Sequence, residues 1–369
     1  MGDRSAIEWC DASWNPIRGC SRVSEGCRNC YAERDAIRMA HTPLGSCCDH
    51  SLDQHEPLDL PPFTAPAGRC AESGCRCRGW VPDPKYPAGP YYGLVKSTPT
   101  GPRWTGAVRF VPELLDLPLR WRRPRRIFVN SMSDLFHEKV EDEWIARIFS
   151  VMYASPRHVF QVLTKRPERM QAWLSRCGNG GGLGWITHDG PEPEKAYRGT
   201  GIIVGNTDRW PLPNVWLGTS CEDQPTAEAR IIHLLQTPAA VRFASYEPAL
   251  AAVDFMPWLV KERRTVVAAG GIAQQETIAI DWLIAGGESG PGARPFDLAW
   301  ARSAIAQCRA AGVPCFVKQL GARPCSSVPS DPFPPCDALD RDPRASLRDR
   351  KGGDMAEWPE DLRVQEFPG

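Results

Sequence analysis

Three cysteines stand close together near the start of the chain, in the segment "RGCSRVSEGCRNCYAE". Six residues separate Cys20 from Cys27, and two separate Cys27 from Cys30. On a helical turn, the Cβ atoms of Cys27 and Cys30 would lie about 5–6 Å apart, and the longer loop lets Cys20 complete a triangle. Three thiolates in this arrangement suit a soft metal centre that keeps one coordination position open.

Two kinds of centre are compatible with this spacing. A structural zinc ion normally has four Cys or His ligands, and neither residue type follows Cys30 before His41. Zinc would therefore need His41 or a cysteine from further along the chain. A [4Fe-4S] cluster held by three thiolates instead leaves one iron free. A ligand with an amino and a carboxylate group, such as S-adenosylmethionine, could chelate that iron.

Composition restricts the setting of such a centre. The chain has 369 residues, and its 44 basic and 44 acidic side chains cancel, so no global field attracts nucleic acid or an anionic membrane. It contains no apolar run of membrane-spanning length, and the start "MGDRSAIEWCDASWNP" lacks a signal-peptide pattern. We expect a cytoplasmic protein without a membrane partner; the oligomeric state is not predicted. In a reducing compartment, we expect the 15 cysteines to remain unpaired.

The chain alternates short β-branched runs with amphipathic helical stretches. Near-continuous apolar runs indicate strands that are buried on both faces, as in a parallel sheet. Six runs are clear, and two weaker ones near 13–17 and 107–111 bring the total to about eight; the clear runs cover 125–134, 158–168, 214–223, 241–248, 281–290 and 314–321. In the stretch 297–312, the apolar residues share one face and Gly312 suits the helix end.

This alternation predicts a (β/α)8 TIM-type barrel, or an incomplete relative of it, with a doubly wound open sheet as the alternative. The barrel would span residues 1–321. Insertions rich in Pro, Gly, Cys or His interrupt it at about 41–104 and 177–213. A polar, Pro-rich tail follows at 322–369, and we expect insertions and tail to lie outside the core.

Polar side chains follow each clear strand at its carboxyl end, where parallel α/β folds bind ligands. The alternative is helix capping, which accounts for Asp134 or Asp223 but does not call for Lys165 or Lys318. The candidates are Asn130, Ser131, Ser133, Asp134, Thr164, Lys165, Arg166, Ser220, Glu222, Asp223, Tyr246, Glu247, Glu288, Ser289, Lys318 and Gln319.

Seven motifs in order resemble the phage-associated three-cysteine family, which is known as a domain of unknown function. They cover about residues 5–40 and 105–321, and read "IEWCDASWNPIRGCSRVSEGCRNCYAE", "RRIFVNSMSDLFHE", "FQVLTKRPERM", "WLGTSCEDQ", "RFASYEP", "WLIAGGESGPGARP" and "FVKQLG". The cysteine segment also resembles the radical S-adenosylmethionine superfamily. Its usual pattern is C-x3-C-x2-C, whereas this chain has C-x6-C-x2-C followed by Tyr31.

The second resemblance implies an enzyme with a [4Fe-4S] cluster on Cys20, Cys27 and Cys30. Such an enzyme cleaves S-adenosylmethionine to a 5′-deoxyadenosyl radical and takes its electron from a donor such as flavodoxin or ferredoxin. "GGESG" resembles the superfamily's glycine-rich cofactor motif. We expect cofactor contacts from Tyr31, Asn130, Ser131, Ser133, Asp134, Ser220, Glu247, Gly286, Gly287 and Glu288, and catalytic roles for Lys165, Tyr246 and Glu288.

The phage association, and a general similarity to radical enzymes of DNA repair, imply a nucleotide or nucleic-acid component as substrate. A peptide or small metabolite is the first alternative, and a non-catalytic zinc-binding protein is the second. Whether the enzyme is a lyase, an oxidoreductase or a transferase stays open, as does whether S-adenosylmethionine is consumed or regenerated.

Two further clusters have competing interpretations. The insertion could hold a second metal, although its spacing matches no strong zinc signature and ordinary loop thiols are favoured; its candidates are His41, Cys47, Cys48, His50, His55, Cys70, Cys75 and Cys77. The basic run "RWRRPRR" at 120–126 could bind phosphate. We favour the simpler interpretation that its arginines complement a helix carboxyl terminus on the face opposite the reactive rim.

Overall fold

The computed structural model describes residues 5, 7–41, 55–56, 69–70, 89–178, 210–267, 273–337 and 347–369. The chain forms two compact units. Unit 1 comprises Met1–Ile17, Val23–Asn29 and Phe110–Gly369, and unit 2 comprises Arg18–Arg22 and Cys30–Arg109.

A seven-stranded sheet forms the centre of unit 1, and each pair of neighbouring strands is parallel. Its order is β1 (Ala12–Trp14), β8 (Arg126–Val129), β9 (Val159–Thr164), β10 (Val215–Cys221), β11 (Val241–Tyr246), β14 (Trp282–Gly286) and β16 (Cys315–Gln319). The order follows the chain without reversal, whereas a doubly wound sheet reverses at a switch point. The doubly wound alternative is therefore wrong.

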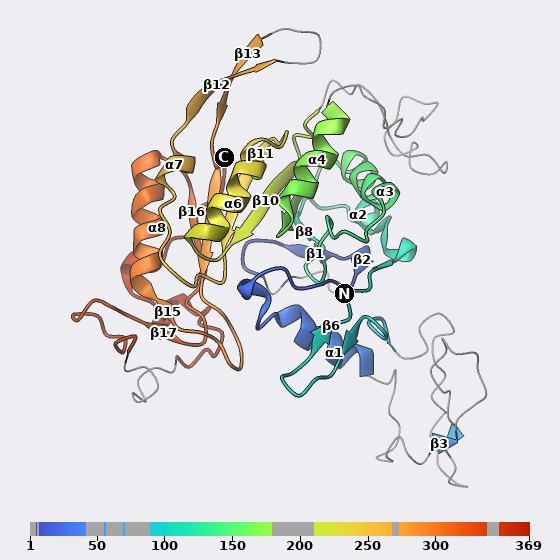
Figure 1. Cartoon of the computed structure of the whole chain (residues 1–369), viewed down its shortest axis with the longest axis horizontal. Coiled ribbons are helices and arrows are strands. Elements are labelled where there is room, and N and C mark those ends of the chain that lie inside the picture. Colours follow the sequence, from blue (N-terminus) through green and yellow to red (C-terminus); the bar gives the residue numbers. More distant parts are fainter. Residues whose placement is uncertain are drawn as a thin grey trace. The chain divides into compact units, whose positions relative to one another are not determined.

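The sheet curls into a half-barrel with α-helices along its outer side (Figure 1). The prediction of an α/β fold with parallel strands is confirmed, but a closed eight-stranded barrel is not found among the described residues. The run near 107–111 forms only β7 (Arg109–Phe110), which lies outside this sheet. Two-residue strands such as β7 and β2 (Ile17–Arg18) are too short to extend it.

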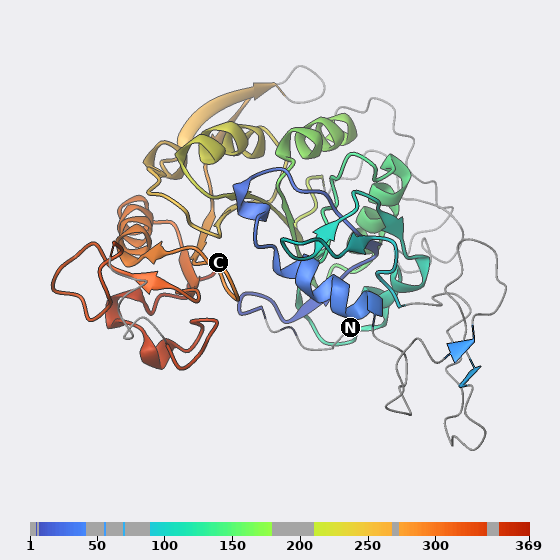
Figure 2. The same ribbon diagram turned by 60° about the horizontal axis from the view of Figure 1, so that its bottom comes forward.

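The helices of unit 1 begin and end where local sequence dictates. Asp223 caps α6 by accepting from the Thr226 amide at 2.9 Å, and Asp297 caps α8. As predicted, α8 ends at Gly312, whose φ is 67°. Helices α4 and α6 run side by side (Figure 2). The helices are α2 (Leu117–Arg120), α3 (Asp142–Tyr153), α4 (Pro167–Gly178), α6 (Gln224–Leu235), α7 (Met256–Leu259) and α8 (Leu298–Ala311).

Shorter elements complete unit 1. A ribbon of β12 (Glu262–Val267) and β13 (Ala273–Ile278) is antiparallel, and β15 (Phe296–Asp297) pairs with β17 (Pro324–Cys325). Single turns of 3-10 helix within the described residues are η1 (Glu25–Cys27), η3 (Pro112–Leu114), η5 (Met355–Glu357) and η6 (Glu360–Leu362).

The two faces of the sheet have different cores. Alternate residues of β11 show the division: Ala244 and Tyr246 join the core that includes α6 and α8, whereas Phe243 joins an aromatic cluster on the other face. In that cluster, the ring centroids of Trp216 and Trp282 lie 5.8 Å apart. Aromatic rings thus fill the inner face near the amino ends of the strands, so polar inner side chains are placed towards the carboxyl ends.

The last residues of the chain cover the free edge of β16. The Val317 amide donates to the Val364 carbonyl at 2.8 Å, and Phe316 forms an antiparallel bridge with Gln365. The Phe367 ring packs on Trp282, with centroids 5.4 Å apart. Covering an edge strand in this way satisfies its backbone groups and prevents it from pairing with another chain.

The expectation that residues after Gly321 lie outside the core is therefore wrong for part of the tail. Trp358 and Leu362 are fully buried in the core beside α8. The expectation of unpaired cysteines is also wrong at one place, because Cys325 and Cys336 form a disulfide.

Unit 2 is organised around the buried carboxylate of Glu33. This residue belongs to α1 (Tyr31–His41) and accepts from Arg22 Nε at 3.0 Å and from the Trp104 amide at 3.0 Å. These bonds tie α1 both to the segment containing Cys20 and to β6. The strands of unit 2 are β3 (His55–Glu56), β4 (Arg69–Cys70), β5 (Val95–Lys96) and β6 (Arg103–Trp104).

Several predictions fall on residues outside the described set. These include most of the 41–104 insertion, with Cys47, Cys48, His50, Cys75 and Cys77, and residues 179–209 of the second insertion. Within the described residues, no helix combines the length and the apolar character that crossing a membrane requires.

Candidate functional site

A buried carboxylate marks the carboxyl edge of the sheet in unit 1. The Glu222 side chain, just after β10, is 1% exposed and forms ion pairs with Lys165, which follows β9, and with Arg230 of α6. Arg230 NH1 lies 3.0 Å from Glu222 Oε2. Burial alone would raise the pKa of Glu222, but the two cations lower it below its ordinary value. Glu222 is therefore ionised at neutral pH.

Glu222 also contacts the turn of the backbone that contains Cys27. The Ser24 hydroxyl donates to Glu222 Oε1 at 3.1 Å. Gly26 lies so close that an added Cβ would be 2.2 Å from the same oxygen. No larger residue fits at position 26 unless Glu222 moves. Residues 24–29, here called the cysteine turn, thus rest directly on this carboxylate.

A second buried carboxylate, Glu288, fixes the other end of the cysteine turn. Asn29 Nδ2 donates to Glu288 Oε2 at 2.9 Å and to the Gly292 carbonyl at 2.8 Å. Arg294 donates to Glu288 Oε1 at 2.7 Å through NH2. Burial would raise the pKa of Glu288, but the hydrogen bonds from Arg294 and Asn29 lower it. The turn is therefore fastened at both ends to ionised carboxylates that follow β10 and β14.

A third carboxylate, Asp134, organises the region after β8. Its Oδ1 accepts from the Thr164 hydroxyl at 2.7 Å and from the Phe136 amide at 2.9 Å. Its Oδ2 lies 3.1 Å from Arg166 NH1 and accepts from the Lys165 amide at 3.1 Å. Asp134 thus joins the chain after β8 to the chain after β9, and both of its oxygens are engaged within the protein.

The other predicted residues after β8 hold the chain that follows β1. The Ser133 hydroxyl donates to the Ile17 carbonyl at 2.8 Å, and that of Ser131 to Asn15 Oδ1 at 3.2 Å. Asn130 Oδ1 accepts from the Ile17 amide at 3.3 Å, while its own backbone has a positive φ of 58°. Asparagine tolerates this left-handed conformation better than most residues. These side chains make structural bonds at the positions where cofactor contacts were expected.

An ion pair between Lys318 and Glu247 lies on the inner side of β11 and β16. Lys318 Nζ is 2.5 Å from Glu247 Oε1, and Gln319 Nε2 donates to the Gly287 carbonyl at 2.9 Å. Ser220 is buried nearby on β10, and its carbonyl accepts from Arg230. The predicted Lys165, Ser220, Glu247 and Glu288 thus all lie at the carboxyl edge.

Tyr246 does not lie with them. Its side chain points into the outer core, with its ring centroid 5.3 Å from that of Phe255, and its hydroxyl donates to the Ala251 carbonyl. Burial raises the pKa of Tyr246 well above its usual range. The expected catalytic role is corrected accordingly, because side chains alternate along β11 and this position faces the helices.

The glycines of "GGESG" serve strand packing. A Cβ at Gly287 would lie 2.5 Å from the Leu320 carbonyl oxygen, so only glycine permits this approach. The Gly287 amide donates to the Gln319 carbonyl at 3.0 Å, and the Gly286 carbonyl accepts from the Ala249 amide at 3.0 Å. The Gly287 N–H is therefore engaged between the strands, and the expected cofactor contacts of Gly286 and Gly287 stay predictions.

The three cysteines of the predicted centre are partly exposed. Cys27 belongs to unit 1, whereas Cys20 and Cys30 belong to unit 2. Thiolates are chemically suited to a soft metal centre. Among the described residues, no three Cys, His, Asp or Glu side chains are positioned together as metal ligands. Tyr31, the first residue of α1, is 40% exposed.

Four other cysteines lie in a different environment from these three. They are buried, and they are Cys10, Cys221, Cys308 and Cys315. Burial raises the pKa of Cys10 to about 11 and that of Cys221 to about 12. These two thiols remain protonated at neutral pH and are poor metal ligands. Partial exposure thus distinguishes the three cysteines of the predicted centre from these four buried cysteines.

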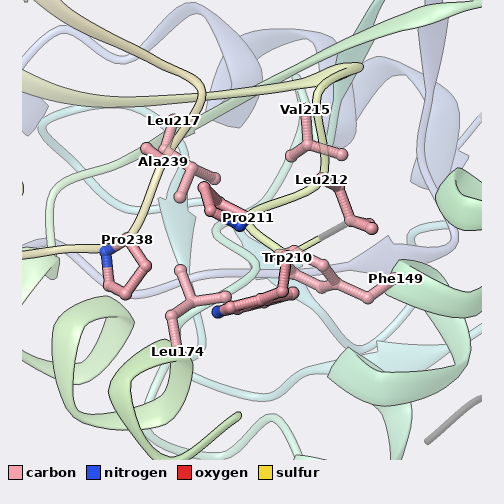
Figure 3. Close-up of a pocket in the computed structure, with 9 residues that line it drawn as sticks. All are labelled: Phe149, Leu174, Trp210, Pro211, Leu212, Val215, Leu217, Pro238 and Ala239. Atoms are coloured by element: carbon pink, nitrogen blue, oxygen red, sulfur yellow. The ribbon is translucent and has the colours of Figure 1, made fainter. Parts of the chain in front are cut away.

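A small apolar pocket lies away from the carboxyl edge (Figure 3). It contains no titratable group, and we interpret it as a packing gap. The lining residues come from α3, from α4, from β10 and the loop before it, and from the chain before β11. They are Phe149, Leu174, Trp210, Pro211, Leu212, Val215, Leu217, Pro238 and Ala239.

Sequence reasoning missed the residues that hold the cysteine turn. Ser24, Gly26 and Asn29 lie between the cysteines, and the sequence patterns assigned no role to them or to Arg230. Arg294 stands six residues after Glu288, within the same motif. A polar residue beside each cysteine and an arginine near a strand-end glutamate were the available signals.

The fold and this site define an α/β protein with a parallel half-barrel and a cysteine turn fixed at its carboxyl edge. A family model matches residues 4–58 and 88–351, and the chain belongs to that family, described as "Protein of unknown function (DUF5131)". No curated protein and no solved structure matches the chain.

Proposed function

We propose that this protein is a radical S-adenosylmethionine enzyme whose [4Fe-4S] cluster binds to Cys20, Cys27 and Cys30. The observation that supports this most directly is the fixation of the cysteine turn by Glu222 and Glu288 at the carboxyl edge of the sheet. Parallel α/β folds bind ligands at that edge. A turn that merely linked two elements would not need two buried carboxylates.

When bound, the cluster and S-adenosylmethionine would supply the one-electron cleavage of the sulfonium and the abstraction of hydrogen from a substrate carbon. The protein's own residues perform other tasks. Glu222 and Glu288 hold the turn, and Lys165 and Arg294 balance their charges. The aromatic cluster around Trp282 closes the inner face below the polar edge and keeps water out. The electron would come from a donor such as flavodoxin or ferredoxin.

We propose a nucleotide or nucleic-acid component as the substrate, because the motifs resemble a phage-associated family. A peptide or small metabolite remains the alternative substrate. The non-catalytic zinc protein remains an outcome that metal analysis would reveal.

The test is metal content and colour after purification without air. The proposal expects a brown protein with about four iron and four sulfide per chain, and formation of 5′-deoxyadenosine when reduced protein meets S-adenosylmethionine. Cys27→Ala should lose the colour, whereas the matched control Cys308→Ala, a buried cysteine in α8, should keep it. A colourless protein with one zinc, or equal iron in both variants, would overturn the proposal.

A further inference from the structure

The amino edge of the sheet carries a cluster of arginines that the proposed chemistry does not use. Five arginines occur within 120–126, between α2 and β8, and the segment 117–128 contains no acidic residue. Arg157, from the loop between α3 and β9, reaches the same place. Its Nε donates to the Trp121 carbonyl and its NH2 to the Leu119 carbonyl, each at 2.9 Å. Two separate segments therefore contribute guanidinium groups to one surface.

Some of these arginines are committed to structural partners. Arg120 pairs with Asp116 at 2.6 Å, and Arg126 lies 3.6 Å from Asp11. By contrast, Arg122 and Arg123 are exposed and form no ion pair within the described part of the chain. Their charges are available to an outside partner.

The neighbouring arginines are held in place by an aromatic residue. Arg125 Cζ lies 4.9 Å from the centroid of the Trp121 ring, while Arg157 binds the backbone of that residue. Trp121 is itself buried, so both guanidinium groups extend from a rigid support. A preorganised cation loses less conformational entropy on binding than a freely rotating one.

A helix carboxyl terminus does not account for this cluster. Only Arg120 belongs to the last turn of α2, and that helix has four residues, so its dipole is small. All the cations are arginine, whose planar fork binds phosphate oxygens in pairs. No large exposed apolar side chain of the described residues lies in 117–128, as membrane insertion would require.

We propose that this surface, formed by Arg122, Arg123 and Arg125 and braced by Arg157, binds the phosphate backbone of a nucleic acid. Phosphate contacts set the position and orientation of a bound strand without reading its sequence. The surface lies at the amino ends of β8 and β9, at the opposite edge of the sheet from the cysteine turn. This surface would tether a nucleic acid to the protein. Binding of the nucleic acid requires neither a metal nor the proposed radical reaction.

The test uses the full-length, metal-free protein and a fluorescent oligonucleotide of about 20 nucleotides, single-stranded or duplex. Fluorescence anisotropy would give the affinity between about 50 and 200 mM KCl. We expect Arg122→Glu with Arg123→Glu to weaken binding at least about tenfold and to reduce the slope of log K against log salt on duplex by about 2. Arg309→Glu, at an exposed arginine late in α8, is the matched control and should bind like the wild type.

Far-UV circular dichroism of each variant checks that the fold is retained. Wild-type affinity in the double variant, an equal loss in Arg309→Glu, or binding that ignores salt would overturn the proposal. Preferential binding to vesicles containing phosphatidylserine, with no binding to oligonucleotides, would also overturn it. Because the protein carries no metal in this assay, the result is separate from that of the iron analysis.

Discussion

Replacing Glu222 by glutamine should measure what the buried carboxylate contributes to unit 1. Glutamine preserves the shape and can still accept the Ser24 hydrogen bond, but it leaves Lys165 and Arg230 facing each other without a counter-charge. Removing one member of a buried ion pair costs about 3–5 kcal/mol. Because the two cations keep some exposure and one hydrogen bond survives, we expect the lower end, about 3 kcal/mol, in the free energy of unfolding.

The loss should depend on pH in a defined direction. The folded pKa of Glu222 is lower than its unfolded value, because Lys165 and Arg230 outweigh the effect of burial. Between the two pKa values the unfolded chain binds more protons, so stability rises with pH. The contribution of Glu222 is complete above its unfolded pKa, about 4.3, and is lost as the pH falls through the folded value. Glutamine does not titrate and lacks this contribution.

Urea unfolding, followed by tryptophan fluorescence at about pH 7 and about pH 3, would measure the difference between Glu222→Gln and the wild type. We expect the difference to shrink in acid. Glu228→Gln is the matched control, because Glu228 is exposed on α6 and bonds only to Gln224 among the contacts described. The reasoning is refuted if Glu222→Gln stays within about 0.5 kcal/mol of the wild type at neutral pH, or if the gap is unchanged at about pH 3.

Two further predictions concern backbone packing and the disulfide. Gly287→Ala should destabilise the protein by at least about 2 kcal/mol, because its Cβ would lie 2.5 Å from the Leu320 oxygen; Gly286→Ala, where the nearest atom is 3.3 Å away, should cost clearly less. Equal losses in thermal unfolding would contradict the packing role. Replacing Cys325 and Cys336 by serine should cost about 3 kcal/mol for a loop of this length. Reduction should release two more free thiols from the wild type than from this double variant. An unchanged thiol count would show that the pair is not bonded.

The strand ends and helix ends could be predicted because their signals are local. A carboxylate at a strand end, such as Glu222 or Glu288, is visible as the first polar residue after an apolar run. The residue that binds it cannot be recognised in this way, because Asn29 lies 259 residues away from Glu288 in the sequence. Pattern reasoning therefore identified one side of each contact at the edge and missed the side contributed by the cysteine turn.

The number of strands and the role of the tail could not be obtained in this way. A run such as 107–111 has strand character, but local pattern does not decide whether it joins the main sheet. The tail has only a few apolar residues among many polar ones, which is typical of a solvated segment. Yet Trp358, Leu362 and Phe367 pack against the core at separate places. Burial of isolated apolar residues depends on tertiary context and leaves no periodic signal.

Two buried carboxylates beneath one short turn favour positioning as their purpose. A buried ion pair contributes little net stability, since the desolvation of both charges offsets their attraction, and apolar replacements are often as stable. Glu222 and Glu288 are nevertheless each paired with arginine and each receive a hydrogen bond from the cysteine turn. An apolar contact would bury the turn but would not define its orientation, because it lacks direction. Directed bonds at both ends restrict where the Cys27 thiol can lie, as the proposed role of Cys27 in binding a cluster requires.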